Sequence, residues 1–174
     1  MKKKVFSLMM MLLLAVTGFV RADELTVHDG TVTNAYVPVY GFYADAYLKC
    51  EMVYPASELS AMNGGQINSL TFGISSPAAE AWTGTFEVFV KEVSDATISD
   101  YTGTTGATTV YTGTLDGTGS TMTVNFTAPY TYNGGNLLVG FYQTSKGNYK
   151  SITWIGEAVS GASVQGYHYS DLNR

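Results

Sequence analysis

The sequence predicts an all-β protein, folded as a two-sheet antiparallel β-sandwich with jelly-roll-like connections. Three observations support this prediction. The chain of 174 residues has 19 Gly and 13 Tyr, and it is rich in Thr and Val, a composition typical of strands and turns. Short segments with alternating apolar and polar residues recur along it, and Gly, Asn and Asp separate them. An immunoglobulin-like sandwich is the alternative, although that fold has about seven strands in about 100 residues.

Ten segments carry a strand pattern, and polar turns bound each of them. The predicted strands are residues 24–28, 35–42, 46–54, 67–75, 83–93, 108–115, 121–128, 136–144, 149–155 and 163–169.

Segment 46–54 shows how the alternation assigns side chains to faces. Leu48, Cys50 and Met52 share one face, because residues two apart on a strand point the same way. Lys49 and Glu51 occupy the opposite face, which we expect to be solvated. Cys50 is therefore predicted to be a buried small apolar residue and not a nucleophile.

The same alternation predicts the inward faces of three further strands, and one segment differs from them. Segment 136–144 is apolar on both faces, as a central strand would be. The predicted inward residues of segments 67–75, 83–93 and 121–128 are Leu70, Phe72 and Ile74, then Phe86, Val88 and Val90, then Met122, Val124 and Phe126.

Two connections have local sequence signals. Residues 116–119 (DGTG) are predicted to form a hairpin turn between two strands, because their glycines accept a positive φ. Residues 55–62 are the one stretch predicted to be helical, over one or two turns. Pro55 suits a first helical position and the following Asn63-Gly64 suits a C-terminal cap.

The N-terminus is predicted to be a secretory signal peptide, residues 1–22. Three lysines precede an apolar run over residues 5–20, and Val20-Arg21-Ala22 offers a cleavage site after Ala22. The run is short for a membrane-spanning helix, which needs about 20 apolar residues. The exported protein would then be one domain, residues 23–174, secreted or displayed at the cell surface.

Charge and cysteine content exclude several classes of protein. The chain has nine basic and 14 acidic residues, and the predicted cleavage removes basic residues but no acidic one. Repulsion from phosphate therefore makes nucleic acid or an anionic membrane surface an unsuitable partner. The single cysteine, Cys50, cannot form an intramolecular disulfide, so the hydrophobic core must hold the domain together.

The sequence contains no catalytic motif. The two histidines, His28 and His168, are far apart and lack zinc-ligand spacing. No Gly-x-Ser-x-Gly elbow occurs, and the acidic residues are scattered without an evident pair. We therefore predict no enzyme activity, no catalytic or metal-binding residues and no cofactor. A structural calcium ion remains open, with Asp95, Asp100 and Asp116 on loops as its candidate ligands.

Aromatic residues give the only binding signal. Tyr36, Tyr40 and Tyr43 lie close together in the sequence, and Trp82 lies in a loop just before a strand. Exposed aromatic rings can stack on the faces of sugar rings, so these four residues are the predicted ligand-binding residues. The alternative is that they fill ordinary packing positions. Trp154, in mid-strand beside Ile152, is predicted to belong to the core.

Four segments resemble a known family: residues 25–30 (LTVHDG), 36–41 (YVPVYG), 54–59 (YPASEL) and 130–140 (YTYNGGNLLVG). They are similar to the N-terminal β-sandwich domains of large secreted surface proteins of anaerobic Gram-negative bacteria. More distantly, the chain resembles the cleaved-adhesin (haemagglutinin) domains attached to gingipain proteases. The resemblance implies a jelly-roll sandwich used for adhesion or targeting, and it implies no catalytic residue. It leaves open whether the chain is the N-terminal module of a longer protein.

These observations predict a noncatalytic extracellular module for adhesion or binding at the bacterial cell surface, with an unidentified glycan or protein as its ligand. The alternative is a carbohydrate-binding module, ancillary to a secreted hydrolase. A hydrolase would need a pair of its scattered carboxylates to converge.

Overall fold

A computed structural model of the chain describes residues 24–170. The predicted signal peptide, residues 1–22, lies outside the described residues. No helix among residues 24–170 is both long and apolar enough to cross a bilayer.

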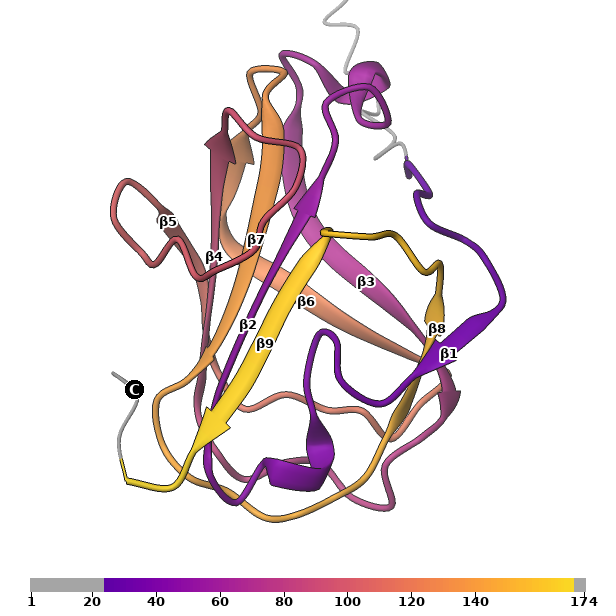
Figure 1. Cartoon of the computed structure of the whole chain (residues 1–174), viewed down its shortest axis with the longest axis vertical. Coiled ribbons are helices and arrows are strands. Elements are labelled where there is room, and N and C mark those ends of the chain that lie inside the picture. Colours follow the sequence, from indigo (N-terminus) through magenta and orange to yellow (C-terminus); the bar gives the residue numbers. More distant parts are fainter. Residues whose placement is uncertain (1–23, 171–174) are drawn as a thin grey trace, which may run out of the picture.

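In residues 24–170, nine antiparallel strands form two sheets that pack face to face, so the predicted β-sandwich is confirmed (Figure 1). The four-stranded sheet has the order β1 (Val32–Asn34), β8 (Thr153–Gly156), β3 (Gln66–Ser76), β6 (Thr121–Thr131). The five-stranded sheet has the order β5 (Thr108–Gly113), β4 (Phe86–Val93), β7 (Asn136–Gln143), β2 (Tyr47–Tyr54), β9 (Ser163–His168).

Almost every connection carries the chain from one sheet to the other. Only β4 and β5 are joined as neighbours in one sheet. This pattern favours the jelly-roll-like connectivity over the immunoglobulin-like one, in which several consecutive strands share a sheet. The predicted hairpin at residues 116–119 is therefore wrong, because β5 and β6 belong to different sheets. Asp116 instead shapes a local turn by accepting hydrogen bonds from the backbone and hydroxyl of Thr118.

Eight of the predicted segments contain strands, and the central position of β7 confirms the prediction for 136–144. Segments 24–28 and 35–42 do not form strands, whereas the short β1 between them does. The cause lies at Asn34, whose Oδ1 accepts hydrogen bonds from the backbone N–H groups of Tyr36 and Val37 and so turns the chain. The predicted helix reduces to a 3-10 helix, η2 (Ser60–Met62).

The predicted inward faces meet in one core between the sheets, so the alternation assigned them correctly. Leu48, Cys50 and Met52 of β2 are buried there, as expected. The bulkiest fully buried side chains in this core are Trp82, Trp154, Tyr132, Phe86, Phe141 and Met122.

The outer face of the five-stranded sheet carries a second, smaller core that the sequence did not predict. Val53, Phe89, Leu138 and Tyr142 are buried on it, and Ile98 in the loop 94–107 packs against them. This packing needs Gly140, because a Cβ there would collide with the ring of Phe89. The five-stranded sheet is therefore covered on both faces.

Glu51 fastens the covering loop to the sheet, and its predicted solvation is wrong. Its side chain is 0% exposed. It accepts hydrogen bonds from the backbone N–H groups of Thr102 and Gly103, at 2.8 and 2.9 Å, and from the hydroxyls of Thr102 and Tyr142. These four donors replace the water that a buried carboxylate loses. Lys91 adds bonds to carbonyls of the same loop.

Replacing Glu51 by Ala would leave these four donors without their acceptor. We expect Glu51→Ala to lower the free energy of unfolding by about 3 kcal/mol, since buried unpaired polar groups are costly. The matched control is Glu87→Ala on the same sheet face, where the carboxylate accepts one exposed bond from Thr109; its cost should stay below about 1 kcal/mol. Urea unfolding of both variants measures the difference, and equal costs would show that Glu51 does not hold the loop.

Candidate functional site

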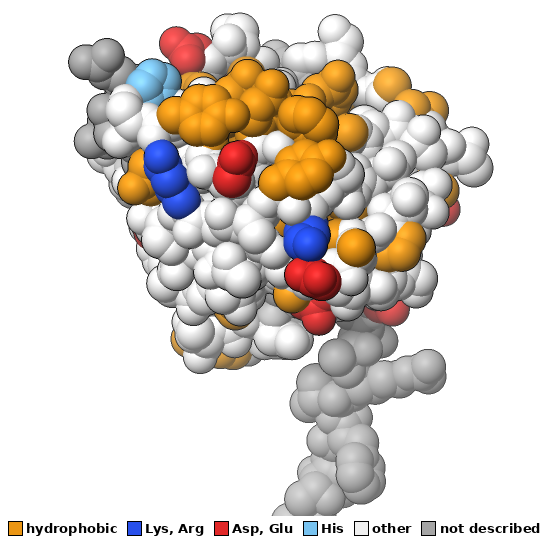
Figure 2. Space-filling view, turned by 90° about the horizontal axis from the view of Figure 1, so that it is seen from below, with side chains coloured by type: hydrophobic (Ala, Val, Ile, Leu, Met, Phe, Trp, Pro, Cys, Tyr) orange, Lys and Arg blue, Asp and Glu red, His pale blue; other side chains and the backbone are white. Residues whose placement is uncertain are grey.

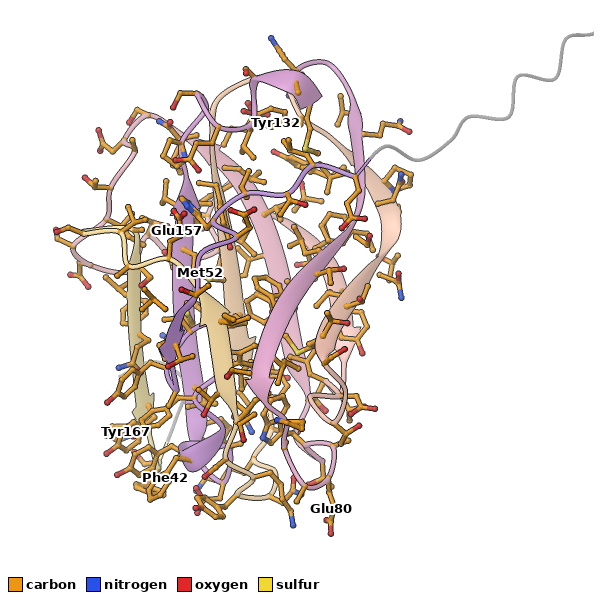
Figure 3. The ribbon with its side chains drawn as sticks, turned by 90° about the vertical axis from the view of Figure 1, so that its right-hand side faces the viewer. Phe42, Met52, Glu80, Tyr132, Glu157 and Tyr167 are labelled. Carbon is orange, nitrogen blue, oxygen red and sulfur yellow. The ribbon has the colours of Figure 1, made fainter. Side chains whose placement is uncertain are left out.

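Aromatic side chains gather at one end of the sandwich and form its most distinctive surface. Figure 2 shows this group of hydrophobic side chains from below, and Figure 3 labels two of its members, Phe42 and Tyr167, at the same end. We call this surface the aromatic end, and its residues are Tyr36, Tyr40, Phe42, Tyr43, Tyr149, Tyr167 and Tyr169.

A tight turn brings the first part of the aromatic end into place. Residues Gly41–Tyr43 form a 3-10 helix, η1, with a hydrogen bond from the N–H of Tyr43 to the carbonyl of Tyr40. Gly41 is required there, because a Cβ would collide with the carbonyl of Lys150 and lie 3.0 Å from the indole of Trp82. The N–H of Lys150 in turn donates to the carbonyl of Gly41. The turn therefore lies directly on the segment that carries Tyr149.

The rings contact one another and so limit each other's movement. Tyr43 and Tyr167 stack with centroids 3.6 Å apart and planes 10° apart. Tyr40 meets Tyr36 and Tyr43 edge to face, at 4.8 and 5.1 Å. Such pairs stabilise by about 1 kcal/mol beyond the burial of their area. The rings therefore form an ordered surface and do not project as separate side chains.

Five members of the aromatic end remain between 40% and 52% exposed: Tyr36, Phe42, Tyr149, Tyr167 and Tyr169. Isolated exposed apolar side chains are common, but a contiguous exposed group marks a contact surface. This group includes five side chains that come from three separate stretches of the chain. Ring faces and phenol hydroxyls are thus presented together to solvent.

Three tyrosines of the aromatic end, Tyr40, Tyr167 and Tyr169, have a raised pKa. The neighbouring Tyr43 side chain, followed by desolvation and the charges of nearby tyrosines, raises the pKa of Tyr167 to about 12. Desolvation also raises the pKa of Tyr40 and of Tyr169. Lys146 places its ammonium group 5.9 Å from the centroid of Tyr169. These three hydroxyls are therefore neutral, and both the Lys146 ammonium and the Asp45 carboxylate lie near Tyr169.

The structure brings together three of the four predicted ligand-binding residues. Tyr36, Tyr40 and Tyr43 all belong to the aromatic end. Phe42, Tyr149, Tyr167 and Tyr169 were not predicted as ligand-binding residues from the sequence. The alternation in segment 163–169 was a signal for the last two, because Tyr167 and Tyr169 point the same way on a strand.

Trp82 requires a correction, since it is 1% exposed and cannot serve as a platform for a ligand. Its indole lies 6.3 Å from that of Trp154, and its Nε1 donates to the carbonyl of Lys150 at 3.0 Å. Gly117 makes this burial possible, because a Cβ at that position would lie 2.9 Å from the indole. Trp82 therefore supports the aromatic end from beneath. Trp154 lies in the core, as predicted.

The candidate metal and catalytic residues remain dispersed. Among residues 24–170, no three His, Cys, Asp or Glu side chains come together as a metal-binding group, and this includes Asp95, Asp100 and Asp116. Nδ1 of His168 lies 2.8 Å from the hydroxyl of Ser170, but no carboxylate of the described part contacts that ring. A Ser-His pair without an orienting acid lacks one member of a catalytic triad.

Comparison of the chain with protein-family models, curated proteins and solved structures finds no match.

Cys50 should behave as a structural residue, since it is buried between the sheets. Desolvation, with the neighbouring Glu51 carboxylate second, raises the pKa of its thiol and so suppresses the reactive thiolate. We expect a thiol reagent to leave native protein unmodified over hours at pH 8 and to label it within minutes in 6 M guanidinium, with the labelled mass read by mass spectrometry. Rapid labelling without denaturant would contradict this assignment.

Trp82→Ala should destabilise the whole domain, because it removes a buried indole and its hydrogen bond. We expect the free energy of unfolding to fall by about 3–5 kcal/mol. The matched control is Tyr169→Ala, which truncates an exposed ring of the aromatic end and should cost about 1 kcal/mol or less. Chemical denaturation separates the two variants. A small cost for Trp82→Ala would restore the possibility that this side chain faces a ligand.

Proposed function

We propose that the protein is a noncatalytic extracellular module that mediates adhesion or binding at a bacterial cell surface, with the aromatic end as its contact surface. The observation that carries this proposal is the cluster of interlocked, half-exposed rings at one end of the sandwich. The signal-peptide pattern of residues 1–22 supports export, and the resemblance to bacterial surface proteins supports a role in adhesion.

Ring contacts within the aromatic end favour binding in physical terms. Association normally costs about 0.5–1.5 kcal/mol for each side chain that becomes immobilised. The Tyr43–Tyr167 stack and the edge contacts of Tyr40 restrict these rings before any ligand arrives. Less conformational entropy is then lost on binding, and the apolar ring faces still gain from leaving water.

Carbohydrate is the ligand class that the chemistry of this surface fits best. Flat rings can stack on the C–H faces of a sugar, while neutral phenol hydroxyls can exchange hydrogen bonds with its hydroxyl groups. Tyr36, Phe42 and Tyr167 offer such rings. A protein ligand is the second candidate, because Tyr is also enriched where proteins bind one another. The noncatalytic role is supported by the sequence, which contains no catalytic motif and resembles noncatalytic surface domains.

A glycan array tests the proposal, with the full exported chain as the probe. We expect retention on a subset of glycans, and a loss of at least about fivefold in affinity in Phe42→Ala and Tyr167→Ala, since a stacking contact contributes about 1–3 kcal/mol. The matched control is Tyr101→Ala, which removes an exposed tyrosine of the loop 94–107 that does not belong to the aromatic end.

Three outcomes would change the proposal. Binding to immobilised cell-surface proteins instead of glycans, with the same dependence on Phe42 and Tyr167, would assign the aromatic end to a protein ligand. Binding that survives both substitutions would place the contact surface elsewhere. Turnover of a glycan or peptide substrate by the purified protein would refute the noncatalytic assignment.

A further inference from the structure

One edge of strand β3 has no partner strand over most of its length. β3 pairs with β6 over residues 66–73, but on its other side β8 pairs only at Ile74 and Ser76. No other strand of the described residues 24–170 pairs along that second edge. The backbone groups of an unpaired edge are a template for another strand.

The unpaired edge lies along a cleft between the two sheets. The cleft has a volume of about 1130 Å³ and includes residues 66–73 in its lining. Its apolar lining includes Met52, Leu137 and Trp154. Figure 3 looks onto this side of the sandwich and labels Met52 and Glu157, which lies at the mouth of the cleft. A space of this size, apolar inside and with a backbone edge along it, matches the requirements of an extended peptide.

An N-terminal segment, which we call the strap (residues 24–30), partly covers the cleft. Residues 24–28 line it, and Leu25 and Val27 pack against the core. In the described structure the strap forms no strand and makes no backbone–backbone hydrogen bond with either sheet. It occupies the cleft by its side chains, while the backbone edge of β3 stays unused.

His28 links the strap to two carboxylates. Its Nε2 lies 3.2 Å from Glu58 and its Nδ1 lies 3.2 Å from Glu157. The residue has a φ of 54°, a left-handed conformation that is uncommon for a residue other than glycine. A neutral imidazole has one N–H group, so it can donate to only one of these carboxylates. Lysine or arginine carries several donors and would satisfy both.

We propose that the cleft binds an extended strand of a partner protein, which displaces the strap, pairs with the 66–73 edge of β3 and places a Lys or Arg side chain between Glu58 and Glu157. Alternate apolar side chains of this strand enter the space that Leu25 and Val27 occupy. Eight residues at about 3.3 Å each would run the length of the edge. Of the residues of the aromatic end, Tyr36 also lines the cleft. The proposed strand contacts the edge of β3 and two carboxylates instead, so this proposal does not depend on the proposed function.

Charge complementarity identifies a partner protein and not a second copy of this chain. Glu24, His28 and Glu157 line the cleft, and Glu58 contacts His28. The chain has a formal charge of −5, and none of its described strands offers a free cation to such a site. Lys91 is already bonded to the loop 94–107, and Lys49 lies over the rings of Tyr101 and Tyr142. A strand of another protein whose Lys or Arg side chain is free can bind the carboxylates without losing such contacts.

Synthetic peptides test the proposal. The probe is the fluorescent octapeptide Thr-Leu-Thr-Val-Lys-Val-Thr-Val. One control replaces its Lys by Glu, and the other replaces the Thr at its third position by Pro. We expect anisotropy titration of the exported chain to show at least tenfold tighter binding of the Lys peptide than of either control. The double variant Leu25→Ser/Val27→Ser should release the strap. We expect it to bind the Lys peptide more tightly than the native chain does, because the strap competes for the same space.

Two measurements locate the binding site. Hydrogen exchange should show added protection of the amides of residues 66–73 in the Lys-peptide complex. The double variant Glu58→Gln/Glu157→Gln should remove the preference for Lys over Glu but retain the penalty for Pro. Phe42→Ala, which alters the aromatic end, should leave peptide affinity unchanged, so failure of one proposal does not imply failure of the other.

Three results would overturn the inference. The first is no binding of the Lys peptide to either the native chain or the strap-release variant. The second is protection at another sheet edge, such as β9 or β5, in place of β3. The third is equal affinity for the Lys, Glu and Pro peptides, which would indicate apolar adsorption without strand pairing.

Discussion

The packing of two indoles between the sheets determines where the exposed surface of this protein forms. Trp82 donates from its Nε1 to the carbonyl of Lys150, and Trp154 donates in the same way to the carbonyl of Val39 at 2.9 Å. A buried indole N–H needs such an acceptor. The two acceptors belong to the two segments that bear Tyr40 and Tyr149, so satisfying the core fixes the loops that build the aromatic end. The position of the aromatic end therefore follows from the hydrogen bonds of the two buried indoles.

The two sheets differ in how they are covered, and this asymmetry separates the rigid part of the molecule from its accessible edges. Hydrogen bonds to Glu51 and Lys91 hold the loop 94–107 over the five-stranded sheet, which buries that sheet on both faces. The four-stranded sheet has no comparable cover in the described part of the chain, and β8 stops short along β3. The unpaired N–H and C=O groups of such an edge are available to pair with a strand of another chain.

Local alternation was sufficient to predict most strands and their inward faces, because burial on one side of a strand leaves a period of two in the sequence. It failed where contacts are distant in sequence. Glu51 alternates like a solvated residue, yet a loop about fifty residues later covers it. Trp82 lies in a loop sequence, but Gly117 and Lys150 enclose it. The sequence predicts the grouping of Tyr36, Tyr40 and Tyr43. The position of Tyr149 and Tyr167 beside them depends on the order of the strands in space.

The aromatic end and the cleft share Tyr36, but the contacts proposed for each surface come from different residues. The strap ends at residue 30, and β1 then pairs with β8 through Val32, Thr33 and Asn34. Asn34 also caps the turn into Tyr36 through its side chain. Displacing the strap would break the apolar contacts of Leu25 and Val27 and the contacts of His28 with Glu58 and Glu157, but none of these backbone pairs. The two surfaces also differ in chemistry: one presents neutral ring faces and the other a backbone edge beside carboxylates, so one ligand would not satisfy both.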